Sequence, residues 1–195
     1  MVRRTQADME QTRATLLQTA RQVFSTRGYG ETSMDDLTAQ ANLTRGALYH
    51  HFGDKKGLLA AVIEQIDAEM DARLHAISDT ASNPWDGLRS RCRAYLEMAR
   101  EPEIQRIVLR DGRAVLGAPT PQAQLHCVAS LRGILQQLME QGVIAQASPQ
   151  ALALLINGGL AEAAFWIAEA QGQHQRLEQA LAAMELMLEG LRAGN

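Results

Sequence analysis

Apolar residues recur at intervals of three and four along nearly the whole chain, and no stretch alternates apolar and polar residues over a strand's length. This spacing places apolar side chains on one face of an α-helix, whereas a half-buried strand needs a period of two. Capping residues that precede a proline mark helix starts at Asn83-Pro84, Thr120-Pro121 and Ser148-Pro149. Aromatic residues make up only 4% of the chain, which also disfavours sheets. We predict an all-α fold.

The apolar spacing and the helix-start and helix-stop signals together predict about nine helices joined by short loops. The chain of 195 residues is long enough for two lobes that share the long helix 55–78. We expect an N-terminal domain over residues 1–55 and a C-terminal domain over 56–195. The predicted helices are 9–27, 34–41, 45–51, 55–78, 84–100, 102–115, 121–141, 148–171 and 174–192.

Composition and cysteine content favour a soluble protein of the cytoplasm. Hydrophobic residues are 46% and charged residues 21%, and no apolar run approaches the roughly 20 residues of a membrane span. The N-terminus lacks the apolar stretch of a signal peptide. Cys92 and Cys127 cannot make a disulfide framework, and we expect both to be buried thiols. A cytoplasmic protein is therefore expected, rather than a secreted or membrane-spanning one.

Residues 32–59 contain two short predicted helices separated by a tight turn. Thr32 or Ser33 can cap the first helix, and Asn42 suits the left-handed residue of the turn. Leu48 and Phe52 lie four apart and face the core. This layout is a helix-turn-helix, in which the second helix enters a DNA major groove. The side chains left facing outward are Thr44, Arg45, Gly46, Tyr49 and His50.

The outward residues have the chemistry that DNA contacts need. Arg45 can present a bidentate fork to guanine, and Thr44 can contact a thymine methyl or a phosphate. Tyr49 and His50 can donate to phosphate oxygens, and Lys55-Lys56 adds positive charge at a helix N-terminus. Tyr49 as a core residue is the alternative. Adjacent histidines point in different directions on a helix, so the neighbouring His50 and His51 do not indicate a metal site.

The stretch Thr32–Leu59, including Tyr49-His50-His51-Phe52 and Lys55, resembles the DNA-binding signature of the tetracycline-repressor (TetR) family. Leu16–Phe24 followed by Gly28-Tyr29 is similar to the same family. The resemblance implies an all-helical homodimer with an N-terminal DNA-binding head and a C-terminal effector domain. Asn42 replaces the usual glycine of the turn and tolerates the same backbone. The candidate DNA-binding residues are Ser33, Thr44, Arg45, Gly46, Tyr49, His50 and Lys55.

The expected function is a transcriptional repressor that a small organic effector releases from a palindromic operator. The alternative is a DNA-binding regulator without such an effector, controlled by a protein partner. No nucleophile and base pattern, phosphate loop or metal-ligand spacing appears in the sequence, so neither an enzyme nor a cofactor is expected.

The last two predicted helices carry a candidate dimer interface. Leucine and methionine recur at spacings of four and three in helix 174–192, which is typical of a seam for a partner helix. The pair Gly158-Gly159 weakens helix 148–171 by roughly 1 kcal/mol each, so close packing of another backbone is expected there. Packing within the chain alone is the alternative. The candidate interface residues are Leu152, Gly159, Ala163, Leu177, Leu181, Met184 and Leu188.

Asp111 falls on the apolar stripe of predicted helix 102–115, where a carboxylate needs a partner. One interpretation is a salt bridge to an arginine such as Arg91. The other is that Asp111, Tyr95, Glu162 and Trp166 line a pocket for a small organic effector, which can be cationic.

Overall fold

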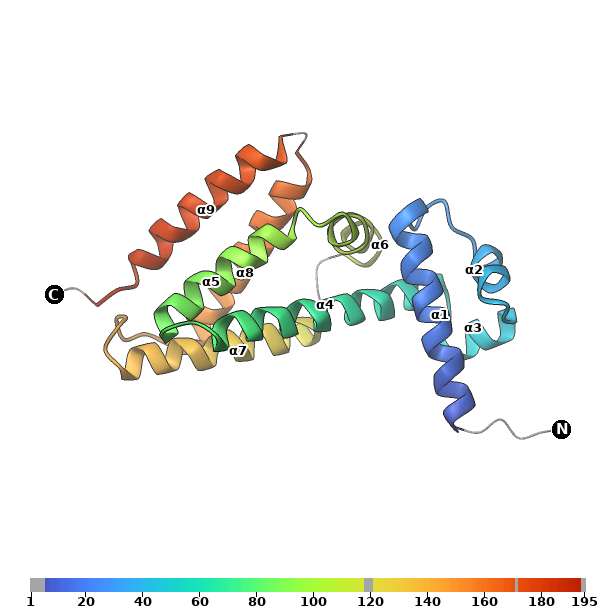
Figure 1. The fold of residues 1–195 in the computed structure, drawn as a ribbon, viewed down its shortest axis with the longest axis horizontal. Helices are drawn as coiled ribbons and strands as arrows, with labels where there is room; N and C mark the ends of the chain where they lie inside the picture. Colours follow the sequence, from blue (N-terminus) through green and yellow to red (C-terminus); the bar gives the residue numbers. More distant parts are fainter. Residues whose placement is uncertain (1–5, 118–120, 171, 194–195) are drawn as a thin grey trace. The chain divides into compact units, whose positions relative to one another are not determined.

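The computed structural model describes residues 6–117, 121–170 and 172–193, and the side chains of 121–126 lie outside that description. Within these ranges the chain forms nine α-helices and one π-helix (Figure 1). Ile144 and Arg192 make an isolated β-bridge, and the described residues contain no strand. The prediction of an all-α fold is confirmed.

The helix bounds lie close to the predicted ones. Asn83 and Ser148 cap their helices as expected, since their side chains accept from the backbone N–H groups of Asp86 (2.9 Å) and Ala151 (3.2 Å). Thr120 lies outside the described residues. The elements are α1 (Gln6–Arg27), α2 (Met34–Ala41), α3 (Arg45–Phe52), α4 (Lys55–Asp79), α5 (Pro84–Met98), η1 (Ile104–Gly112), α6 (Arg113–Leu116), α7 (Pro121–Glu140), α8 (Pro149–Ala168) and α9 (Gln173–Glu189).

The chain divides into two compact units, each made of two segments. The first unit comprises residues 1–66 and 105–118, and the second comprises 67–104 and 119–195. The first unit therefore includes the N-terminal half of α4 and almost all of η1, in addition to α1, α2 and α3.

In the first unit, α1 packs against α2 and α3, and these two short helices pack against each other. Their inward faces supply the core, in which Leu16, Phe24, Leu37 and Leu48 are each at most 1% exposed. The buried positions of α1 recur at intervals of three and four, so one face of this helix packs on the core. The eight-residue helices α2 and α3 are too short to be stable alone and depend on this packing.

The turn between α2 and α3 has the geometry that the sequence predicts. Ser33 and Asp36 form a reciprocal capping box at the start of α2. Asn42 ends the helix in the left-handed conformation, at φ 53°. The N–H of Leu43 then donates to the carbonyl of Thr38 at 3.0 Å, which closes the helix end. Thr44 caps α3 by accepting from the N–H of Ala47.

In the second unit, α5, α7, α8 and α9 pack around an apolar core (Figure 1). Leu88, Leu96, Leu135 and Leu138 are fully buried there. Among the described helices, α8 is the one long and apolar enough to cross a membrane by length and composition, a test that a core helix also passes. It has 20 residues, and 28% of its most apolar stretch is buried within the chain.

Three residues of the predicted dimer seam on α9 are covered by the chain itself. Leu177, Met184 and Leu188 are buried, and α9 packs against α5 and α8 of the same chain. Leu181 is half-buried, as are Leu152 and Ala163 on α8. Apolar spacing identified a buried face correctly, and for Leu177, Met184 and Leu188 the packing partner lies within the chain.

The glycine pair of α8 faces away from the chain's own backbone. A Cβ built at Gly158 or Gly159 would meet no described atom within 4 Å. The close backbone packing expected at this pair is therefore not supplied by the described part of the chain.

Substitution at Asn42 tests the left-handed turn. Asn42→Val places a β-branched side chain at φ 53° and should lower the free energy of unfolding by about 1–2 kcal/mol. Asn42→Gly, the matched control, should stay within about 0.5 kcal/mol of the parent. Urea unfolding followed by circular dichroism gives both values. A valine variant as stable as the parent would contradict the assigned backbone.

Candidate nucleic-acid interface

The outward face of α3 contains the residues that the sequence placed there. Thr44, Arg45, Gly46, Tyr49 and His50 are all exposed, and 52% of Tyr49 is accessible to solvent. On the opposite face Ala47 and Leu48 are buried, 7% and 0% exposed. A large exposed aromatic residue on a helix held from behind is typical of a surface that another molecule covers.

Arg45 is not free, because Asp35 of α2 holds it. Two guanidinium nitrogens of Arg45, Nε and Nη2, donate to the two carboxylate oxygens of Asp35. The hydrogen bond that Arg45 donates to Asp35 raises the pKa of Arg45, and both side chains remain more than half exposed. Asp35 was not paired with Arg45 in the sequence analysis. Nε and Nη2 are committed to this carboxylate, so Arg45 must release Asp35 before the same edge of the guanidinium can contact another acceptor.

Ser33 and Thr44 are partly committed to helix capping. The Ser33 hydroxyl donates to Asp36 at 2.6 Å, and this bond lowers the pKa of the Asp36 carboxyl. Both capping side chains are nevertheless exposed, on residues next to the N-termini of α2 and α3. Helix N-termini attract anions, so these positions suit a phosphate oxygen.

Lys55 lies over an aromatic ring that the sequence reasoning did not include in the site. Its Nζ atom is 4.0 Å from the centroid of the Tyr29 ring, a cation–π contact. Burial lowers the pKa of Lys55, and the nearby Asp111 carboxylate opposes that shift. Asp54 caps α4 by accepting from the N–H of Gly57 at 2.7 Å. Lys55 is therefore held at the start of α4.

Two side chains of η1 bind the backbone on either side of the turn that follows α1. Gly28 has φ +85°, in the left-handed region, so the chain turns sharply after α1. Arg106 donates through Nη2 to the carbonyl of Arg27 at 2.6 Å. Asp111 accepts through Oδ2 from the N–H of Tyr29 at 2.7 Å. We call these two bonds the Gly28 clamp.

An arginine does lie beside Asp111, as one interpretation expected, but it is Arg106 and not Arg91. Asp111 lies 3.8 Å from Arg106 Nε, and Arg91 instead donates to Asp71 at 2.9 Å. Asp111 and Tyr29 are 82 residues apart in the sequence, so no local sequence pattern indicated the hydrogen bond between them.

The segment predicted as α-helix 102–115 is a π-helix over 104–112, and this geometry makes the clamp possible. Hydrogen bonds between residues five apart bring side chains five apart onto one face. Arg106 and Asp111 are five apart and both reach the Gly28 turn. Gly112 permits the tight packing, because a Cβ there would lie 2.8 Å from Ile63 Cδ1 on α4.

The four residues of the predicted effector pocket come from both compact units. Asp111 belongs to the first unit, whereas Tyr95, Glu162 and Trp166 belong to the second. Trp166 is 41% exposed and its ring is covered by the Arg176 guanidinium at 4.9 Å. Glu162 is also exposed, while burial raises the pKa of Tyr95 well above its ordinary value. The effector pocket stays a prediction.

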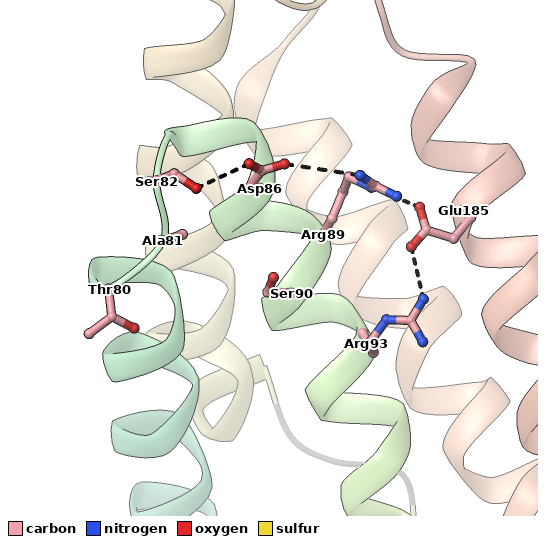
Figure 2. Close-up of a pocket in the computed structure, with 8 residues that line it drawn as sticks. All are labelled: Thr80, Ala81, Ser82, Asp86, Arg89, Ser90, Arg93 and Glu185. Carbon is pink, nitrogen blue, oxygen red and sulfur yellow. Dashed lines mark hydrogen bonds and ion pairs between the residues drawn. The ribbon is translucent and has the colours of Figure 1, made fainter.

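A polar depression of about 400 Å³ lies on the second unit, between the α4–α5 connection and α9 (Figure 2). Arg89 and Arg93 both donate to Glu185, at 2.8 and 3.2 Å, and the bond from Arg89 lowers the pKa of Glu185. These charges satisfy one another and leave no obvious anchor for a ligand. The described residues contain no group of three or more metal-ligating side chains.

The fold and the exposed face of α3 define a helix-turn-helix regulator of the DNA-binding class. A family model described as bacterial regulatory proteins of the TetR family matches residues 16–62. A second model, a tetracycline repressor-like C-terminal domain, matches residues 85–191. The chain belongs to the TetR family of transcriptional regulators.

Individual relatives agree with the family models. A TetR-family regulator from Pectobacterium atrosepticum is 70% identical, covers 98% of this chain and 99% of its own, and has a TM-score of 0.93. The TetC protein of transposon Tn10 from Escherichia coli is 26% identical over 155 residues, 78% of each chain. A third protein has a structure that describes the molecular basis for control of antibiotic production by bacterial hormones. It is 27% identical, covers 94% of this chain and 98% of its own, and has a TM-score of 0.73.

Removing one arm of the Gly28 clamp should loosen the turn after α1. Asp111→Ala leaves the Tyr29 N–H without its acceptor and should lower the free energy of unfolding by about 1–3 kcal/mol. Asp111→Asn is the matched control, since its amide oxygen can still accept. Hydrogen exchange at the Tyr29 amide should be faster in the alanine variant than in the asparagine variant. Equal protection in both would show that the bond does not hold the turn.

Proposed function

We propose that this chain is a homodimeric repressor whose two α3 helices read a palindromic operator and which a small organic effector releases. The observation that carries the DNA-binding part is the exposed face of α3 beside the turn at Asn42, with Ala47 and Leu48 buried behind it. A helix-turn-helix dimer reads two half-sites about 34 Å apart, which is why a palindrome is expected.

In this proposal the residues divide into two roles. Arg45 reads a base edge, since its fork matches the two acceptors of guanine. Tyr49, His50 and Lys55 contact phosphates and set the register. Gly46 lacks a side chain and allows close approach of α3 to the bases. Ser33 and Thr44 add contacts at the helix N-termini.

Arg45 and Asp35 should have opposite effects on DNA affinity. Arg45→Ala removes the base contact and should weaken operator binding by about 1–3 kcal/mol, with loss of preference at one base position. Asp35→Asn frees Arg45 and removes a negative charge, so binding should tighten by about 0.2–1 kcal/mol and depend more steeply on salt. Fluorescence anisotropy with a selected operator, over a range of salt, measures both.

Glu31→Gln is the matched control for this pair, because it removes one exposed acid of the same unit outside α2 and α3. It should change affinity less than Asp35→Asn does. If Asp35→Asn weakens binding as much as Arg45→Ala, Asp35 orients Arg45 on the DNA and the exchange is wrong. A binding selection from random DNA that enriches no sequence would contradict the proposal of a specific operator.

The dimer is proposed on the faces of α8 and α9 that the chain leaves uncovered. On α8, Leu154 is 49% and Leu155 73% exposed, and both glycines of the pair lie on this side. On α9, Leu186 is 77% and Met187 44% exposed. Apolar side chains this exposed on neighbouring helices are typical of an interface. The open space at the glycine pair suits close approach of a partner helix.

Charges placed on these faces should separate the protomers. Leu155→Glu combined with Leu186→Glu should give folded monomers that bind the operator poorly, because each would bury an unpaired carboxylate in the interface. Gln137→Glu adds an exposed carboxylate on α7 and serves as the control, which should remain dimeric. Sedimentation velocity measures both. A wild-type monomer at micromolar concentration would contradict the dimer.

The effector part of the proposal is supported by the family and by one structural neighbour. That neighbour, 27% identical, acts in the control of antibiotic production by bacterial hormones. A ligand releases DNA only if it binds the DNA-incompetent state more tightly, and a coupling of about 1–3 kcal/mol gives partial release. Displacement of labelled operator by added compounds tests this part. If a protein partner releases the DNA and no compound does, the alternative regulator without an effector is correct.

A further inference from the structure

A buried polar cluster lies in the second unit, where α4, α5 and α7 each contribute a residue. Arg91 of α5 is 3% exposed and donates through Nη2 to Asp71 of α4 at 2.9 Å. The Cys127 thiol of α7 lies 3.7 Å from the same carboxylate oxygen, and His75 lies 3.4 Å from the other one. The neighbouring arginines Arg89 and Arg93 are exposed and hold Glu185, so Arg91 alone of the three turns inward.

Of the two terminal nitrogens of the Arg91 guanidinium, only Nη2 has a hydrogen-bond partner among the described residues. Its Nη1 atom is buried and has no hydrogen-bond partner among the described residues. A guanidinium nitrogen can only donate, and a buried donor without an acceptor destabilises the folded chain. A charged group in such a position needs an explanation, because an apolar residue would pack there without this penalty.

We propose that Arg91 is the anchor of the effector site and that its Nη1 donates to an uncharged hydroxyl or carbonyl oxygen of a small, otherwise apolar organic molecule. This inference rests on the proposed function, whose effector it describes. Tyr95 of the same helix is half-buried near Cys127 and Asp67, so it belongs to the surroundings of the ligand in this proposal.

The charges around Arg91 determine which oxygen is favoured. Asp71 already balances the guanidinium, and Asp67 adds a second carboxylate near Tyr95 and Cys127. Burial, together with Asp71 and Asp67, raises the pKa of Cys127 to about 11. An anionic ligand would meet the same unfavourable field, and an ammonium group has no acceptor to offer Nη1. A neutral oxygen accepts the bond without adding charge.

Four matched probes separate these chemistries: benzyl alcohol, benzoate, benzylammonium and toluene, each at millimolar concentration. Binding is measured on the full-length dimer by ligand-observed NMR and by the thermal midpoint. Benzyl alcohol should bind about tenfold more tightly than toluene, and the two ions more weakly than benzyl alcohol.

Variants then assign the effect to Arg91. Arg91→Lys keeps a charge for Asp71 but loses the fork, and should abolish the preference for benzyl alcohol over toluene. The double variant Arg91→Met with Asp71→Leu removes the whole ion pair, so it keeps the test valid if the lysine variant misfolds. Arg93→Lys, an exposed arginine on the same helix, is the control and should retain the preference.

Three results would overturn the inference: binding of benzoate or benzylammonium in preference to benzyl alcohol, no selective binding at all, or a crystal structure with only a water on Nη1 at saturating benzyl alcohol. Operator binding is measured in parallel. A protein that binds its operator but whose benzyl alcohol preference does not depend on Arg91 refutes the inference and leaves the proposed function standing. If the preference for benzyl alcohol depends on Arg91 but the protein binds no operator, the ligand site at Arg91 is supported and the proposed function is refuted.

Discussion

The left-handed turn at Gly28 is the constraint on which the first unit depends. Ending α1 there leaves a carbonyl and an N–H on either side of the turn, and η1 satisfies both through Arg106 and Asp111. A Cβ at Gly28 would lie 2.0 Å from Arg106 Nη2, so the clamp and any side chain at this position exclude each other. Tyr29, placed by the clamp, in turn supports the Lys55 ammonium at the start of α4. The position of a proposed DNA contact therefore depends on a residue far along the chain.

Local patterns were sufficient for the helices and for the turn. Spacings of three and four found the buried faces of α1 and α9, and Ser33, Asn42, Asn83 and Ser148 perform the capping and turn roles predicted for them. Each of these roles involves hydrogen bonds within a few residues, so the information is contained in a short window of sequence. The outward set on α3 followed from the same logic, since burial of Leu48 determines which side chains remain outside.

Two kinds of information were not local. Apolar spacing shows that a helix face is buried but not by what, and α9 illustrates this because it has two apolar faces. The face with Leu188 packs within the chain, whereas Leu186 remains exposed. The sequence also could not identify which charged residues pair: Asp111 lies beside Arg106, whereas Arg91, offered as an example of its partner, pairs with Asp71. The π-helical register that brings Arg106 and Asp111 onto one face also has no simple sequence signature.

Under the proposed function, the intramolecular partners of the DNA-contacting cations bear on specificity. Non-specific DNA offers phosphates, and a phosphate must displace Asp35 from Arg45 before it gains that contact. Guanine and phosphate each offer two acceptors to this fork, so either can replace both hydrogen bonds that the exchange breaks. The ion pair therefore weakens every complex in which Arg45 changes partner. Specificity then comes from position, because on an operator a guanine edge lies where α3 presents Arg45, whereas phosphates are the same on every sequence. The net charge of −3 gives little general attraction to DNA, so this base contact carries the selectivity under the proposal.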